Sequence, residues 1–107
     1  MSQPEATLRI DVRPGDPATV TVAGELDLST AAQLQGCVER LLGAGHRRIV
    51  VRLDQLTFCD STGLTTFVRG NRDCTAAGGW LRLAGARGHV ARVIDISGLT
   101  DALLYRP

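Results

Sequence analysis

The sequence predicts an α/β fold, a single compact β/α superhelix with a mixed, mostly parallel sheet and helices mainly on one face. Short apolar strand patterns alternate with amphipathic helical patterns, an order that favours right-handed crossovers between parallel strands. Charged residues interrupt the strands at every second position, whereas strands covered on both faces are usually continuous apolar runs. These residues are Arg9, Asp11, Arg13, Arg52 and Arg82. A length of 107 residues with 44% hydrophobic content fits one domain with one core.

The chain is predicted to open with a hairpin. Residues 8–13 and 19–23 alternate apolar and polar side chains, and Pro14-Gly15-Asp16-Pro17 between them has strong turn chemistry. So short a connection predicts antiparallel pairing. We place the domain at residues 7–107 and expect residues 1–6 to be a flexible N-terminus.

The first helix and the central strand follow. Thr30-Ala31-Ala32-Gln33 fits a capping box, in which Thr and Gln side chains satisfy free backbone N–H groups. Apolar residues at helical spacing continue to Leu42, and Gly43 and Gly45 end the helix. Residues 49–53 are predicted to form the third strand.

The second half repeats the strand and helix pattern. A second helix is predicted after Asp60-Ser61-Thr62-Gly63, with an inward face made by Leu64, Phe67, Val68, Asn71 and Cys74. Gly78-Gly79 ends it, and residues 80–84 form the fourth strand. A third helix is expected over residues 89–96, with Val90, Val93 and Ile94 inward. Residues 103–105 are a candidate for a short last strand.

Composition argues against several classes of function. The net charge is +1 and the charges are interspersed, so no basic stripe suggests nucleic acid or direct membrane binding. Four aromatic residues are too few for a platform that stacks bases. All 12 cationic residues are Arg, which removes the Lys required by a Walker-type phosphate loop or a Schiff base.

The cysteines and histidines indicate no metal or cofactor. Cys37, Cys59 and Cys74 are odd in number and are predicted to be small buried hydrophobes in a reducing cytoplasm. His46 and His89 lack metal-ligand spacing and are expected at the surface. No apolar run approaches a membrane span and no signal-peptide pattern opens the chain, so we expect a soluble cytoplasmic protein.

The segment Phe58-Cys59-Asp60-Ser61-Thr62-Gly63-Leu64 is the most informative part of the chain. It places a carboxylate, two hydroxyls and a glycine at a helix start, where free N–H groups and the helix dipole favour a phosphate. Two interpretations are open: an N-cap, which stabilises by about 1 kcal/mol, or a phosphorylation switch. Gly63 disfavours the helix by about 1 kcal/mol relative to Ala, which the close approach of a partner or kinase would explain.

Three motifs resemble those of the STAS domain family, and more closely its stand-alone bacterial anti-sigma-factor antagonists. They are Gly24-Glu25-Leu26-Asp27, the segment from Phe58 to Leu64, and Ile96-Ser97-Gly98-Leu99. The resemblance extends from about Leu8 to Tyr105, and the family's fold agrees with the one-faced superhelix predicted above.

The resemblance implies a non-enzymatic switch in transcription. Such an antagonist binds an anti-sigma-factor serine kinase when unphosphorylated, and the sigma factor is released. Phosphorylation, here at Ser61, switches it off, and a phosphatase acting on phosphorylated Ser61 resets it. The partner-binding residues implied are Glu25, Asp27, Asp60, Thr62, Gly63 and Leu64.

Two departures from the family and two other functions remain. Arg52 lies where the family often has Asp or Asn near the end of the central strand, and the terminal helix should be short or missing.

One alternative function is a STAS docking subunit of a membrane transport complex, which needs no phosphorylation. A small nucleotide-binding enzyme is disfavoured because Lys and a phosphate-binding Gly-rich motif are missing. No Gly-x-Ser-x-Gly elbow surrounds Ser61, which argues against a hydrolase.

Overall fold

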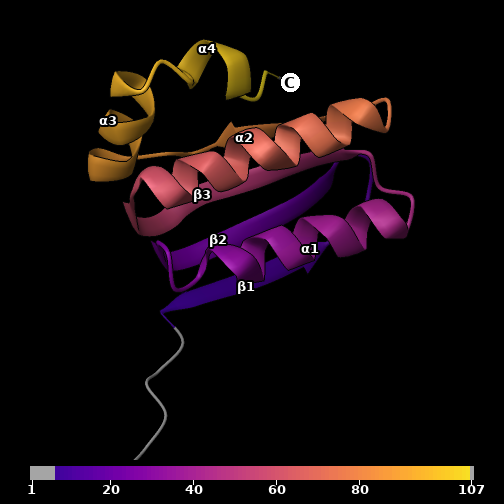
Figure 1. The fold of residues 1–107 in the computed structure, drawn as a ribbon, viewed down its shortest axis with the longest axis horizontal. Helices are drawn as coiled ribbons and strands as arrows, with labels where there is room; N and C mark the ends of the chain where they lie inside the picture. The colour runs from indigo at the N-terminus through magenta and orange to yellow at the C-terminus, as the bar shows by residue number, and fades with distance from the viewer. Residues whose placement is uncertain (1–6, 107) are drawn as a thin grey trace, which may run out of the picture.

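The computed structural model describes residues 7–106, which form a four-stranded sheet in the order β1-β2-β3-β4 (Figure 1). The antiparallel hairpin joins β1 (Leu8–Arg13) to β2 (Ala18–Leu26). The other two pairings, β2 with β3 (Arg48–Cys59) and β3 with β4 (Trp80–Ala84), are parallel. The mixed, mostly parallel sheet is therefore confirmed. The flexible N-terminus predicted for residues 1–6 lies outside the described residues.

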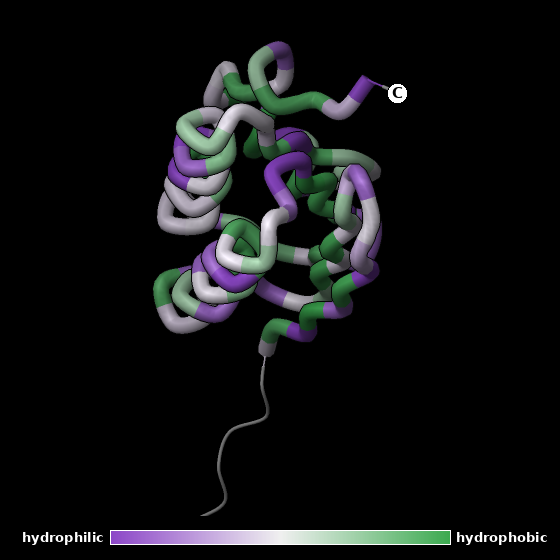
Figure 2. The backbone as a smooth tube through the Cα atoms, turned by 90° about the vertical axis from the view of Figure 1, so that its right-hand side faces the viewer, coloured by the Kyte–Doolittle hydropathy of each residue, from purple (hydrophilic) through white to green (hydrophobic). Residues whose placement is uncertain are grey.

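The helices form a second layer. Helices α1 (Ala31–Gly43) and α2 (Ser61–Ala76) run side by side across one face of the sheet (Figures 1 and 2). Helices α3 (Gly88–Ile96) and α4 (Thr100–Leu103) lie beyond α2, on the side of β4 (Figure 1). Within residues 7–106, no helix combines the length and the apolar character that crossing a membrane requires.

The core lies between the sheet and helices α1 and α2. Alternate strand residues, among them Val20, Val22, Ile49 and Val51, are fully buried. Phe67 of α2 is also buried, and burial of such a side chain stabilises the fold by about 1.5–3 kcal/mol.

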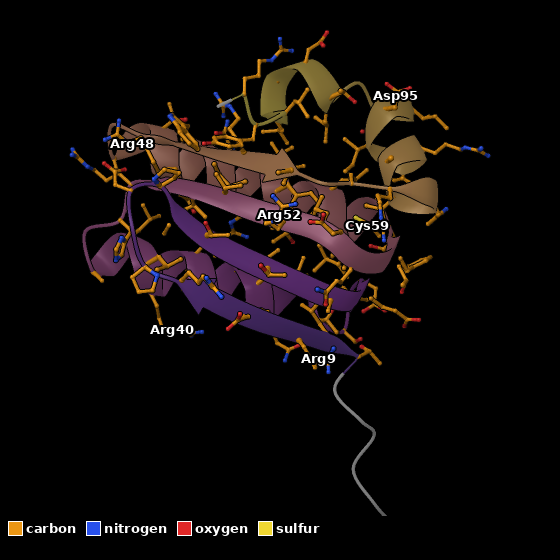
Figure 3. All side chains as sticks on the ribbon, turned by 180° about the vertical axis from the view of Figure 1, so that it is seen from behind. Arg9, Arg40, Arg48, Arg52, Cys59 and Asp95 are labelled. Atoms are coloured by element: carbon orange, nitrogen blue, oxygen red, sulfur yellow. The ribbon has the colours of Figure 1, made fainter. Side chains whose placement is uncertain are left out.

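The opposite face of the sheet carries charge. Arg9, Asp11, Arg13 and Arg52 are exposed there, as Figure 3 shows from behind for Arg9 and Arg52. Val50 is the buried exception. The period-two interruptions thus correctly predicted a sheet whose helices α1 and α2 cover one face.

The central strand is longer than predicted. It extends to Cys59 and not to residue 53. The pairing of β2 with β3 shifts register between Thr21 and Ala23 and again between Gly24 and Glu25. Each shift opposes one additional residue of β3 to its partner, which breaks the apolar alternation that the sequence argument relied on. Arg52 is consequently in mid-strand, where its guanidinium pairs with Asp54 at 2.8 Å.

Three local predictions are wrong. Thr30 makes no side-chain cap, so the capping box is not formed. Val68, predicted to be inward, is 42% exposed. The buried face of α2 is made instead by Gly63, Thr66, Phe67, Gly70 and Cys74. Residues 100–103 form α4, and the predicted last strand is reduced to one bridge between Leu83 and Leu104.

Other predicted positions are confirmed. The three cysteines are free and buried. Val90 and Ile94 of α3 are buried, and Val93 is partly buried. His89 is exposed, whereas His46 is partly buried, with its ring Nδ1 3.1 Å from the carbonyl oxygen of Gly15.

Candidate functional site

The two main motifs meet at the carboxyl ends of β2 and β3. Leu26 pairs with Cys59 in the parallel ladder, and the N–H of Asp60 donates to the carbonyl of Leu26 at 3.3 Å. Carboxyl ends of parallel strands are where open α/β sheets usually place their functional sites. The segments Gly24–Asp27 and Phe58–Leu64 are therefore neighbours although Leu26 and Cys59 are 33 positions apart in the chain.

Asp60 caps α2. Its backbone is extended, and its carboxylate Oδ1 accepts from the N–H of Gly63 at 3.1 Å. Its carbonyl accepts from the N–H of Leu64 at 3.0 Å, which completes the first turn. This is a standard N-cap, worth about 1 kcal/mol. The cap interpretation is thus correct for Asp60, and it leaves the role of Ser61 open.

Ser61 is the first residue of α2 and is exposed. Its hydroxyl forms no hydrogen bond with any other residue in 7–106. Its carbonyl is engaged by Thr65, whose hydroxyl donates at 2.9 Å. The hydroxyl of Ser61 therefore lies at a helix N-terminus with nothing in the described fold competing for it.

Thr62 differs from Ser61 in exposure. It is partly buried, and its carbonyl accepts from the hydroxyl of Thr66 at 3.0 Å. Of the two adjacent hydroxyls, the one on Ser61 is the more accessible to an enzyme acting from solution.

Packing within the protein explains why position 63 is a glycine. A Cβ on this residue would lie 2.7 Å from Sγ of Cys59 and about 3 Å from the side chain of Leu26. The first turn of α2 can pack onto the ends of β2 and β3 only without that side chain. The close approach inferred from sequence is thus between the helix and its own sheet, and a partner contact at Gly63 stays a prediction. Leu64, also predicted to bind a partner, is partly buried against the core.

The start of α1 contains Asp27, which the sequence argument placed beside the phosphorylation site. Its carboxylate accepts from the N–H and hydroxyl of Ser29 at 2.9 and 2.7 Å. These hydrogen bonds, chiefly that of the Ser29 hydroxyl, lower the pKa of Asp27 below its ordinary value. Asp27 is therefore held as an anion that organises its own loop.

Glu25 and Thr30 form the rest of this loop. The hydroxyl of Thr30 is buried, donates to the carbonyl of Glu25 at 2.8 Å and accepts from the N–H of Asp27 at 3.0 Å. The side chain that the capping-box prediction assigned to the helix is instead turned back into the preceding loop. Glu25 itself is exposed at the end of β2.

Apolar side chains near these motifs were missed by the sequence argument. Leu28, next to Asp27, is 81% exposed, and Phe58, at the end of β3, is 38% exposed. The ring of Phe58 stacks on His89 of α3, with centroids 5.6 Å apart. Leu28 lies in a polar loop, which was the available signal, whereas Phe58 lies in β3 and its exposure depends on how that strand is aligned.

Cys59 is close to Ser61 in sequence but is not a reactive group. It is buried, and burial raises the pKa of its thiol to about 12, so the thiolate required for nucleophilic chemistry does not form near neutral pH. Within residues 7–106, no group of three His, Cys, Asp or Glu side chains is arranged to hold a metal ion.

Comparison with known proteins agrees with this arrangement. A family model described as "Mlab, STAS domain" matches residues 7–105. The chain belongs to the STAS domain family. The anti-sigma-B factor antagonist of Staphylococcus aureus is 32% identical over 84 residues, which cover 78% of each protein.

Solved structures of similar proteins show the same fold. The crystal structure of an anti-sigma factor antagonist from Mycobacterium paratuberculosis has a TM-score of 0.80 and 25% identity, and covers all of this chain and 92% of that one. The anti-sigma factor antagonist SpoIIAA in its unphosphorylated form has a TM-score of 0.77 and 21% identity, covering 94% and 88%. The Bacillus cell fate determinant SpoIIAA in its phosphorylated form has a TM-score of 0.68 and 22% identity, covering 92% of each chain.

Proposed function

We propose that this STAS protein is an anti-sigma-factor antagonist that is switched off by phosphorylation of Ser61. The observation that carries the proposal is the exposed hydroxyl of Ser61, which has no hydrogen-bond partner within residues 7–106 and lies at the start of α2. The names of its relatives, among them the S. aureus anti-sigma-B factor antagonist, support the same function. A solved structure of SpoIIAA in a phosphorylated form supports phosphorylation as the switch.

The fold can accept the modification. A phosphate adds about −1.5 to −2 charges and three acceptor oxygens, and a helix N-terminus offers free N–H groups and positive potential to them. Because the Ser61 hydroxyl makes no contact that the phosphate would break, we expect little change in the fold. The effect on function then comes from the altered surface.

The altered surface is already acidic. Asp60 is adjacent to Ser61, and Asp27 is on the neighbouring loop with its pKa lowered, so it is an anion at neutral pH. A phosphate there concentrates negative charge on a surface that also exposes apolar side chains, Leu28 and Phe58. A partner that packs against a neutral hydroxyl and apolar groups would be repelled by this charge.

The partners follow from this scheme. We propose an anti-sigma-factor serine kinase that binds the unphosphorylated form, and a phosphatase that acts on phosphorylated Ser61. Glu25, Asp27, Asp60, Thr62, Gly63 and Leu64 remain the proposed contact residues, to which the structure adds Leu28 and Phe58 as candidates. The protein itself is proposed to be a cytoplasmic binding module without a cofactor or catalytic activity.

Phosphate mapping tests the proposal. We expect the cognate anti-sigma-factor kinase, with ATP and Mg²⁺, to modify Ser61 as the only major site, measured by tandem mass spectrometry. Ser61→Ala should abolish incorporation, and the matched control Thr62→Ala should retain it. Phosphate found chiefly on Thr62, or full incorporation into Ser61→Ala, would overturn the assignment.

A further inference from the structure

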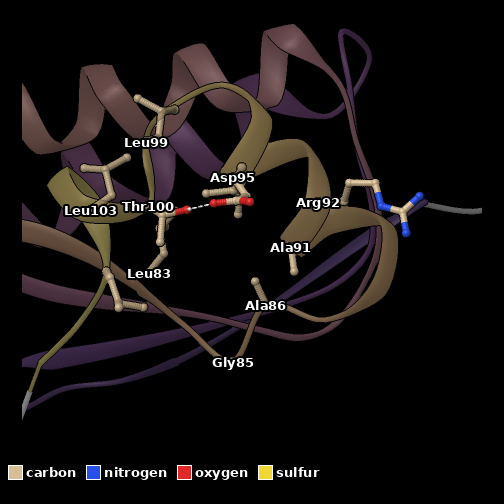
Figure 4. Close-up of a pocket in the computed structure, with 11 residues that line it drawn as sticks. Leu83, Gly85, Ala86, Ala91, Arg92, Asp95, Leu99, Thr100 and Leu103 are labelled. Atoms are coloured by element: carbon tan, nitrogen blue, oxygen red, sulfur yellow. Dashed lines mark hydrogen bonds between the residues drawn. The ribbon is translucent and has the colours of Figure 1, made fainter.

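We propose that a cavity between α3, α4 and the end of β4 binds a small apolar molecule that carries a positively charged amine. The cavity has a volume of about 500 Å³ (Figure 4). Ligand sites in proteins commonly measure about 300–1,000 Å³. No residue of the Gly24–Asp27 or Phe58–Leu64 motifs lines it, so it is distinct from the Ser61 site.

Most of the cavity wall is apolar. The side chains that supply it belong to β4, to the loop after β4 and to both short helices: Leu83, Ala86, Ala91, Ile94, Leu99 and Leu103. Leu83, Ile94 and Leu103 are buried members of the core, and Ala86 and Leu99 pack against it. The wall is therefore held in place by the fold, and a ligand gains hydrophobic stabilisation mainly by covering its partly exposed members, Ala86, Ala91, Leu99 and Leu104.

A carboxylate supplies the polar part of the cavity. Asp95 and Thr100 both line it, and the hydroxyl of Thr100 donates to Oδ1 of Asp95 at 3.4 Å (Figure 4). A hydrogen bond of this length is weak and leaves most of the acceptor capacity of the carboxylate free. Asp95 forms no ion pair with a described residue; within residues 7–106 the pairs are Arg48 with Asp16 and Arg52 with Asp54.

The nearby cation does not cancel this charge. Arg92 lines the cavity, but its guanidinium extends away from the other labelled side chains (Figure 4). Its aliphatic stem can contribute to the apolar wall while its charge remains in water. An ammonium group beside Asp95 would form a charge-assisted hydrogen bond, whereas a ligand carboxylate would be repelled. Apolar walls with one free carboxylate thus favour an apolar amine.

The experiment titrates hexylamine into the full chain and follows the backbone amide resonances by NMR. Hexanoate and hexanol serve as probes with the same tail length. We expect saturable shifts confined to residues of β4, α3 and α4, and binding of hexylamine about threefold tighter than that of hexanoate or hexanol, because Asp95 is exposed to solvent. Equal binding of hexanoate, or shifts scattered over acidic surface residues, would overturn the proposal.

Variants separate the carboxylate from the cavity. Asp95→Asn should weaken hexylamine binding about threefold. The matched control Asp101→Asn removes an exposed carboxylate of α4 that does not line the cavity, and should leave binding unchanged. Ala91→Leu should fill the cavity and abolish binding, while unchanged amide resonances of β1, β2 and β3 verify the fold. Unaltered affinity in Asp95→Asn or in Ala91→Leu would contradict the assignment.

Discussion

The segments that lead into α1 and α2 contain the same residue types with opposite results. Both helices follow strands that pair with each other, and Asp, Ser and Thr stand in close succession at 27–30, before α1, and at 60–62, at the start of α2. In the loop before α1, Ser29 and Thr30 direct their hydroxyls into local hydrogen bonds. At the start of α2, Asp60 is engaged by a backbone N–H, and the hydroxyl of Ser61 has no hydrogen-bond partner within residues 7–106.

Spacing explains the difference. Ser29 and Thr30 lie two and three residues after Asp27, a separation at which their hydroxyls reach its carboxylate or N–H. Ser61 follows Asp60 directly and forms no hydrogen bond with its carboxylate, and the position three residues after Asp60 is Gly63, which has no hydroxyl and donates its N–H to Oδ1 of Asp60. One loop is thereby closed by its hydroxyls, while the other presents a hydroxyl to solvent.

The largest effect on stability should come from removing the hydrogen bonds of Thr30 in the loop before α1. Thr30→Val keeps the shape of the side chain but removes the hydroxyl, so the carbonyl of Glu25 and the N–H of Asp27 lose their partner in a buried position. Such a loss costs about 1–3 kcal/mol. Chemical denaturation should show this decrease in the free energy of unfolding.

Ser61→Ala is the matched control for Thr30→Val. It removes an exposed hydroxyl that no described residue contacts, and should change stability by less than about 0.5 kcal/mol. If both variants lost the same stability, the contrast between the two loops would be wrong.

The second effect concerns the packing of the first turn of α2. Gly63→Ala places a methyl group 2.7 Å from Sγ of Cys59. Because Cys59 and Leu26 are both buried, the overpacking cost should lie in the upper part of the usual range, about 2–3 kcal/mol, from which about 1 kcal/mol of improved helix propensity is subtracted. Thermal or chemical unfolding should show a net loss of about 1–2 kcal/mol.

Gly43→Ala is its control, because a Cβ at Gly43 meets nothing within 4 Å at the end of α1. That variant should be neutral or slightly stabilising. If Gly63→Ala left stability unchanged, internal packing would not require glycine there. A contact with a partner would then be the favoured reason for the glycine.

The smallest expected effect is a change in the pKa of Asp27. The pKa of Asp27 is lowered first by the hydroxyl of Ser29, so Ser29→Ala should raise it towards the ordinary value of 3.8. Because the folded pKa is depressed, the associated stability is present above the unfolded pKa and is lost as pH falls through the folded pKa. NMR titration of the Asp27 carboxyl would measure the change. Ser61→Ala should leave that titration unaltered, and a similar shift in both variants would contradict the separation of the loops.

The sequence predicted the sheet and the one-faced layering, because these depend on periodicity. It offered an N-cap at the start of α2 as one of two interpretations, and that interpretation is correct for Asp60. The capping box at Thr30 failed since a side chain that suits a cap can also turn back to the preceding loop. The end of β3 was missed because two register shifts hide its alternation. The stacking of Phe58 on His89 joins residues 31 positions apart in the chain, which no local pattern could reveal.

Partner affinity of the Ser61 variants tests the central claim most directly. Calorimetry would compare the unmodified protein, Ser61→Ala and Ser61→Asp against the purified anti-sigma-factor kinase. A useful switch needs roughly a hundredfold change in affinity, about 2.7 kcal/mol. Loss of one neutral hydroxyl contact supplies only about 0.5–1.5 kcal/mol, so the remainder must come from the added negative charge.

We therefore expect Ser61→Ala to bind much more tightly than Ser61→Asp, while both keep the fold. The matched control Gln33→Glu adds one negative charge to an exposed side chain of α1 outside the proposed contact residues, and should weaken binding at least about tenfold less than Ser61→Asp. Equal affinities for the unmodified protein, Ser61→Ala and Ser61→Asp would contradict the switch and favour a docking subunit that needs no phosphorylation.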